Sequence, residues 1–241
     1  MIEWAKAGRD ILSQNKNLAP IEKALLESSV QTAELAAGAL LTPVPDIAVE
    51  PKLNLNQEWM RQSQRYIDFG FHTKLGLTEE EYLDSLPKFE PQPEAFNGRF
   101  DIPVIVETRI LPQEQAALAK LNYYLGELKI ADWSKDPNKY KTPDKPYTTW
   151  MQDGKGNLNK SVENVRKALA KDERGATIFD GIALFIARPE ILKDHSIDLP
   201  GTSVGSVDAA CLGVWFDRPE VCYGRVGHAN PGFVSASCGR V

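Results

Sequence analysis

Histidine and cysteine are scarce in this chain, which contains three of each among its 241 residues. Three cysteines cannot all pair with one another, and no stretch resembles a charged, apolar and cleavable leader sequence. We therefore expect a protein of the reducing cytoplasm, where thiols stay free.

Long apolar runs and an excess of basic residues are also missing. The longest apolar run covers residues 33–41 and includes Glu34, so it is shorter than the roughly 20 residues that a membrane-spanning helix needs. The formal net charge is −5, so the chain has no excess of positive charge to attract the phosphates of a nucleic acid. We expect neither membrane insertion nor a nucleic-acid partner.

The motifs of common cofactor-dependent and hydrolytic enzymes do not occur either. The chain has no Walker phosphate loop, no dinucleotide glycine fingerprint, no His-Glu-x-x-His and no Gly-x-Ser-x-Gly. The stretch Gly154-Lys155-Gly156 lacks the leading glycine and the trailing hydroxyl residue of a phosphate loop, so we expect a turn there. The sequence therefore predicts no cofactor.

What the chain does have is the composition of a folded protein, with 42% hydrophobic and 25% charged residues. Residues 1–74 are expected to form a helical N-terminal segment, because helical patterns occur at 2–13, 21–41 and 56–69. A proline-rich linker at 43–51 separates the second pattern from the third. We expect these amphipathic helices to engage a protein partner or a second copy of the chain, with packing on the chain's own core as the alternative.

Residues 75–241 are expected to form a mixed domain with a mainly antiparallel sheet, which makes the predicted fold class α+β. Thr78 and Glu81 have the spacing of a capping box at a helix start. Pro112 and Ser161 are residues typical of a helix beginning. The β-branched and aromatic content predicts strands at 102–110 and at 147–151.

The run at 176–192 carries signals of both kinds. Its β-branched residues favour a strand, whereas its apolar spacing and the pair Thr177 and Asp180 favour a helix that begins near this pair. We favour the helix, which is expected to end before Pro189.

The stretch 209–241 contains all the cysteines and predicts a three-stranded antiparallel meander, with turns at Arg218-Pro219 and near Asn230-Pro231. This register places Cys222 beside Cys238 as a possible disulfide or redox pair, although buried free thiols are the commoner case. It places Cys211 near His228.

A zinc site built from Cys211, Cys222, His228 and Cys238 is the alternative. It needs a different fold of the stretch, because the two pairs would lie roughly 16 Å apart along the strands.

Several phrases resemble an uncharacterised bacterial protein family of unknown function. They are GRFDIPVIVETRI at 98–110, PYTTWMQDG at 146–154, GATIFDGIAL with PEIL at 175–192, and SASCG at 235–239. The resemblance covers roughly residues 75–241 and implies one compact domain, but it implies no activity and no catalytic residue.

Two hypotheses of function follow from these observations. The first is a non-enzymatic binding or assembly protein whose N-terminal helices engage a partner or a second copy. Tyr147, Trp150 and Trp215 are its candidates to line a pocket for a flat or sugar-like ligand, with packing in the core as the alternative. The alternative is a thiol-dependent hydrolase or redox enzyme, with Cys238 as the nucleophile and His195 as its base.

Overall fold

The computed structural model describes residues 53–134 and 140–240, and Asn54–Val241 forms one compact unit. The helices predicted at 2–13 and 21–41 lie outside the described residues. Their expected binding of a partner or a second copy stays a prediction, as does the expected boundary near residue 74.

The described helices begin at residues that suit a first helical turn. Thr78 Oγ1 accepts a hydrogen bond from the backbone N–H of Glu81, and the Glu81 carboxylate accepts one from the N–H of Thr78, which confirms the predicted capping box. Pro112 and Ser161 also begin helices as predicted. The α-helices are α3 (Leu55–Asp68), α4 (Phe71–Lys74), α5 (Glu79–Ser85), α6 (Pro112–Leu118), α7 (Val162–Ala168) and α8 (Ile178–Ala187). Within the described ranges, no helix combines the length and the hydropathy needed to cross a membrane.

The strands of the described residues form two sheets. The first contains β1 (Ile102–Val106), β4 (Tyr147–Gln152), β10 (Ser237–Gly239) and β5 (Glu173–Gly175) in that order. The second contains β2 (Asn122–Tyr123), β8 (Arg218–Arg225), β7 (Asp208–Trp215), β6 (Ser196–Val204) and β3 (Ile130–Asp132), with β9 (Phe233–Ser235) also on β6. The pairs β2–β8 and β6–β9 are parallel and the others are antiparallel. The α+β class is confirmed, but two sheets replace the one expected.

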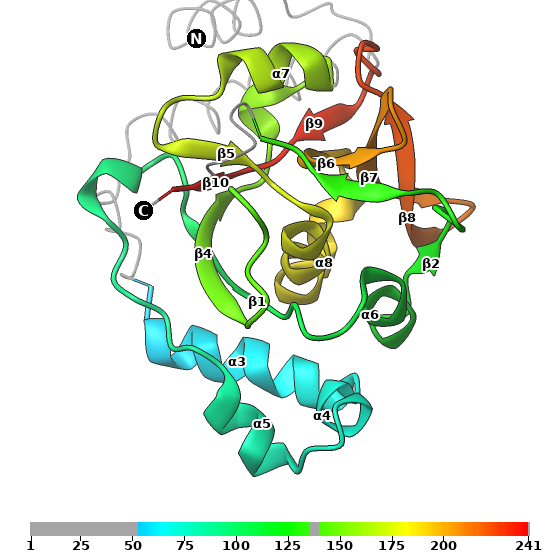
Figure 1. The fold of residues 1–241 in the computed structure, drawn as a ribbon. Helices are drawn as coiled ribbons and strands as arrows, with labels where there is room; N and C mark the ends of the chain where they lie inside the picture. Colours follow the sequence, from blue (N-terminus) through cyan, green and yellow to red (C-terminus); the bar gives the residue numbers. More distant parts are fainter. Residues whose placement is uncertain (1–52, 135–139, 241) are drawn as a thin grey trace, which may run out of the picture. The chain divides into compact units, whose positions relative to one another are not determined.

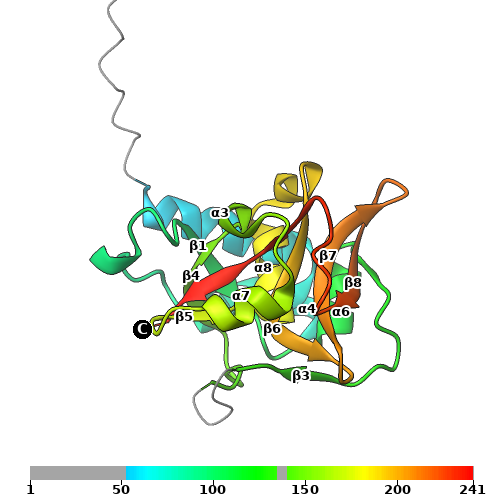
Figure 2. The same ribbon diagram turned by 90° about the horizontal axis from the view of Figure 1, so that it is seen from above.

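Helix α8 lies between the two sheets (Figures 1 and 2), and it contacts β1 on one side and β6 and β7 on the other. It confirms the helix favoured for 176–192, and it ends before Pro189. Nearly all its side chains are buried because both sheets cover it. Gly181 allows this close approach, since a Cβ there would overlap the side chain of Leu199 on β6.

The two sheets also touch directly where β5 and β6 cross. A Cβ added to Gly175 or to Gly201 would overlap the backbone of the other strand. The N–H of Gly201 donates to the carbonyl oxygen of Ala176 at 2.8 Å. The absence of side chains at the two glycines is therefore what lets the strands meet.

The C-terminal stretch does not form the predicted meander. Strands β7 and β8 make the expected hairpin, but β9 pairs with β6 and β10 joins the other sheet. The antiparallel meander consists of β6, β7 and β8. Strand β6 was not expected because Pro200 and Gly201 are turn residues, and the structure accommodates them in a register shift between Leu199 and Ser203.

Candidate functional site

Two of the predicted ligand-binding aromatic residues line one pocket of ≈630 Å³, here called the β4 pocket. Tyr147 begins β4, and Trp150 is buried against Phe96 and Phe100. The volume is in the range usual for small-molecule sites. The wall also includes Pro91, Pro93, Phe96, Tyr140, Pro143 and Arg174.

The loop that carries Phe96 closes one side of the β4 pocket. A Cβ at Gly239, the last residue of β10, would overlap the Phe96 ring. The glycine therefore lets the ring lie directly on the strand, where it packs edge-on against Phe100 with ring centroids 5.2 Å apart. This stacking holds the loop over the sheet.

A buried ion pair borders the β4 pocket on the side of α8. Arg174 on β5 donates from Nη1 and Nη2 to the two carboxylate oxygens of Asp180, at 2.6 and 3.0 Å. The hydroxyl of Tyr147 donates to Asp180 Oδ1 at 2.8 Å. The guanidinium carbon of Arg174 lies 4.5 Å from the centre of the Tyr140 ring, so the cation is held at its edge and on its face.

The start of α8 fixes the position of the Asp180 carboxylate. Asp180 belongs to the capping box of α8, and its Oδ2 accepts from the N–H and the hydroxyl of Thr177 at 2.7 and 2.8 Å. Burial opposes its ionisation, but the attraction of Arg174 and these hydrogen bonds outweigh burial, so the pKa of Asp180 lies below its usual value. The ion pair is thus complete at neutral pH.

The other titratable groups near the ion pair are moved away from neutrality. Burial raises the pKa of Tyr147 and of Tyr140 above the usual value for tyrosine. Burial also raises the pKa of the Cys238 thiol well above its usual value. A general acid or base works best with a pKa near the operating pH, so these three groups are poorly suited to proton transfer.

The structure does not bring Cys238 and His195 together. Cys238 lies on β10 with no exposed surface, opposite Arg174 and Met151. His195 precedes β6, and the parallel pairing of Ser196 with Phe233 places it opposite Gly232, six residues before Cys238. Extended chain of that length spans roughly 20 Å. Each residue therefore has its own separate surroundings.

Trp215 lies at the end of β7, away from the β4 pocket. Its ring is 6.2 Å from the ring of Phe233, measured between centroids, and it covers Gly213, where a Cβ would overlap it. Of the three aromatic residues expected to bind a ligand, Tyr147 and Trp150 thus share a site and Trp215 belongs to the other sheet.

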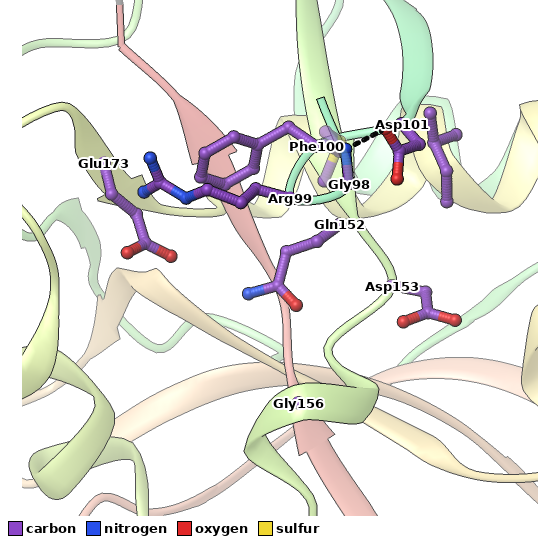
Figure 3. Close-up of a pocket in the computed structure, with 10 residues that line it drawn as sticks. Gly98, Arg99, Phe100, Asp101, Gln152, Asp153, Gly156 and Glu173 are labelled. Carbon is purple, nitrogen blue, oxygen red and sulfur yellow. Dashed lines mark hydrogen bonds between the residues drawn. The ribbon is translucent and has the colours of Figure 1, made fainter. Parts of the chain in front are cut away.

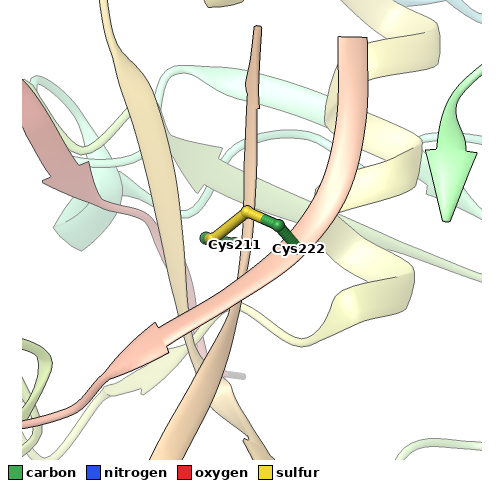
Figure 4. The surroundings of a disulfide bond; sticks show 2 residues. All are labelled: Cys211 and Cys222. Carbon is green, nitrogen blue, oxygen red and sulfur yellow. A yellow bond between two sulfur atoms is a disulfide. The ribbon is translucent and has the colours of Figure 1, made fainter. Parts of the chain in front are cut away.

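Cys211 and Cys222 form a disulfide across β7 and β8 (Figure 4), with their Cα atoms 5.1 Å apart. This corrects both predicted pairs, Cys222 with Cys238 and Cys211 with His228. The prediction assumed that β8 pairs with the last strand, whereas Cys238 lies in the other sheet. Among the residues that the structure describes, no group of three or more His, Cys, Asp or Glu is placed to hold a metal ion.

A second pocket of ≈470 Å³ has a mixed polar and apolar lining and lies near the other end of β4 (Figure 3). Its acidic side chains already have partners. Asp101 accepts from the N–H of Gly98 at 3.0 Å, and Asp153 pairs with Lys155 at 3.0 Å. Glu173 accepts a hydrogen bond from the hydroxyl of Ser237. These contacts stabilise the loops that form the pocket.

The sequence reasoning missed Arg174, Asp180 and Tyr140 as members of the site. Asp180 was assigned only to a helix start, which is one of its two roles. Arg174 and Tyr140 stand in charged, polar stretches that predict surface. The arginine is buried by tertiary contacts, namely the pairing of β5 with β10 and the contacts of its guanidinium with Asp180 and Tyr140. A third pocket of ≈350 Å³ shares Tyr140, Arg174 and Arg240 with the β4 pocket, so these residues separate two hollows.

Comparisons with protein-family models, with curated proteins and with solved structures gave no match.

The burial of Cys238 leads to a direct expectation. In the folded chain at neutral pH we expect no reaction of Cys238 with iodoacetamide, because the thiol is inaccessible and its pKa is raised by burial. After denaturation without a reductant, mass spectrometry should find one alkylated cysteine, since the other two are joined. Rapid labelling of Cys238 in the folded chain, slowed by His195→Ala, would restore the thiol-enzyme hypothesis.

Proposed function

We propose that the domain is a binding module that takes a small ligand with a flat face, aromatic or sugar-like, into the β4 pocket. The observation that carries the proposal is a pocket of ≈630 Å³ with walls of aromatic and proline side chains. Such walls stack on flat rings, and a few fixed polar groups orient the ligand. The Arg174 guanidinium, held by Asp180 and Tyr140, is the main fixed polar group.

The polar side chains beside the β4 pocket favour binding over catalysis, because they are already paired with one another. Asp180 and Arg174 neutralise each other, and the Tyr147 hydroxyl is already engaged with Asp180. A nucleophile needs a lowered pKa or a free base beside it, whereas the pKa of Cys238 is raised and the neighbouring Asp180 carboxylate is paired with Arg174. The alternative of a thiol-dependent hydrolase or redox enzyme using Cys238 is therefore the weaker of the two hypotheses.

The proposal is tested by filling the pocket rather than by removing a buried group. Thr148 lines the β4 pocket and is half-buried, so Thr148→Trp adds a ring inside the cavity. The probes are adenosine, tryptophan and glucose, which present aromatic or sugar faces of different polarity, and binding is followed by saturation-transfer NMR. We expect at least one probe to bind the unaltered chain and to lose about tenfold or more in affinity in Thr148→Trp.

The matched control is Leu158→Trp, which adds the same ring at a side chain that is 51% exposed. Leu158 does not line the β4 pocket. This variant should bind the probe as the unaltered chain does. If no probe binds, or if both variants lose affinity equally, the β4 pocket is not a binding site for flat ligands.

A further inference from the structure

Four side chains form a continuous row across β9, β6, β7 and β8, here called the disulfide row. Ser235 pairs with Asp198, Asp198 with Cys211, and Cys211 with Cys222. Side chains directly opposite each other in neighbouring strands point to the same face, with Cβ atoms about 5 Å apart. The row faces away from α8, because Leu199, the next residue on β6, points toward α8.

The two oxygen-bearing members of the row are both buried. Asp198 is 4% exposed, and burial alone raises the pKa of its carboxyl to about 7. The Ser235 hydroxyl is fully buried and has no hydrogen-bond partner among the described residues. Buried polar groups are normally hydrogen-bonded, so an unsatisfied hydroxyl next to a buried carboxyl and a disulfide needs an explanation.

No charged neighbour compensates for the charge of Asp198. From α7, Arg166 donates to the carbonyl oxygen of Pro200 and Glu163 pairs with Lys167. Lys155 pairs with Asp153 next to the turn that contacts β9. Other titratable groups on or beside this face are Arg218 and Glu220 on β8, of which Glu220 is 9% exposed, and His195, which precedes β6. None of them contributes to the raised pKa of Asp198.

The two sulfur atoms differ in access to solvent. Cys211 is 1% exposed and lies next to Asp198, whereas Cys222 is only half-buried on the far side of the disulfide. The ring of Trp215 covers Gly213, which follows Cys211 by two residues on the same face. An incoming thiol therefore reaches Cys222 more easily than Cys211.

We propose that the disulfide row is a thiol–disulfide exchange site that accepts two electrons from a dithiol. Cys222 is the sulfur attacked, Cys211 is the leaving thiolate, and Asp198 is the proton donor to Cys211. Ser235 is positioned to hydrogen-bond the Asp198 carboxylate after the proton has left. This site is separate from the β4 pocket and does not depend on the function proposed for that pocket.

The exchange proceeds in two balanced steps. A thiolate of the dithiol attacks Cys222 Sγ, and the electron pair of the broken S–S bond goes to Cys211 Sγ, which takes the proton of Asp198. The second thiolate then attacks the reductant's own sulfur in the mixed disulfide and releases Cys222 as a thiolate, which is protonated by solvent. The dithiol leaves as a cyclic disulfide, and solvent returns the proton to Asp198.

The test measures the rate at which dithiothreitol reduces the disulfide of the folded, full-length chain. Measurements run from about pH 5.5 to about pH 8.5, a range that includes the titration of the proposed proton donor. Samples are quenched in denaturant with N-ethylmaleimide, and mass spectrometry then counts one label before reduction and three afterwards. The rate is divided by the thiolate fraction of dithiothreitol. We expect this corrected rate to fall by about 100-fold as pH rises through neutrality, the lower range for a positioned acid.

Asp198→Asn should show the low corrected rate at every pH, whereas Glu220→Gln, which removes another buried carboxyl on the same face, should keep the full pH profile. Each of the other outcomes overturns the assignment. A pH-independent corrected rate in the unaltered chain makes Cys211–Cys222 a structural disulfide only. A profile that survives Asp198→Asn, or that is lost in Glu220→Gln, removes Asp198 as the donor.

Discussion

Asp180→Asn is expected to lower the free energy of unfolding by about 3–5 kcal/mol, the usual cost of leaving one charge of a buried ion pair without its partner. Arg174 would keep its charge at 9% exposure, with no carboxylate left to neutralise it. Asparagine can still accept a hydrogen bond at the start of α8, so most of the loss comes from the ion pair rather than from the helix cap. Urea unfolding at neutral pH measures the change.

The chain offers a matched exposed pair as a control. Arg99 and Asp172 are 2.8 Å apart, but their side chains are 42% and 41% exposed. Asp172→Asn should cost at most about 1 kcal/mol, because exposed ion pairs contribute little. Equal losses in the two variants would show that burial does not strengthen the Arg174–Asp180 pair and would weaken its assignment as the fixed border of the β4 pocket.

The stability of the unaltered chain is expected to contain a contribution from Asp198 that falls as pH rises. Below about pH 4 the carboxyl is protonated in both the folded and the unfolded state and has no effect. Between about pH 4 and pH 7 the folded chain keeps a proton that the unfolded chain has released, so raising the pH favours unfolding. The total loss is about 4 kcal/mol and is complete above neutrality.

Subtracting the unfolding free energy of Asp198→Asn isolates this effect from the other titrating groups. The difference between the unaltered chain and the variant should change by about 4 kcal/mol between acid and mildly alkaline pH, with the variant relatively more stable at the alkaline end. Asp208→Asn is the control, since Asp208 lies on β7 with a side chain 21% exposed and faces Arg225. A pH-independent difference for Asp198→Asn would mean that its carboxyl is solvated in the folded chain.

Local signals were sufficient for the helices and for some strands. The reciprocal hydrogen bonds of Thr78 and Glu81, and those of Thr177 and Asp180, involve residues three positions apart, so spacing alone reveals them. Strand β4 was likewise evident from its aromatic and β-branched residues. These features depend on neighbours along the chain, which a sequence displays directly.

The strand pairing could not be obtained in the same way. Cys222 was assigned to Cys238 by counting back from a turn, but a hairpin rule does not apply once β9 pairs in parallel with β6. The site shows the same limit. Arg174, Tyr147 and Asp180 come from three separate elements, and nothing in their local sequence indicates that one carboxylate serves both other side chains. Tertiary packing decides both outcomes.

The contact between Gly175 and Gly201 has a consequence for how the domain unfolds. At this point the backbone of each sheet packs directly against the backbone of the other. Neither sheet can therefore open while the other stays intact. Packing of α8 on both sheets adds to this mutual dependence. We therefore expect β1–β4–β10–β5 and β2–β8–β7–β6–β3 to melt together in a single cooperative transition, with no stage at which one sheet survives alone.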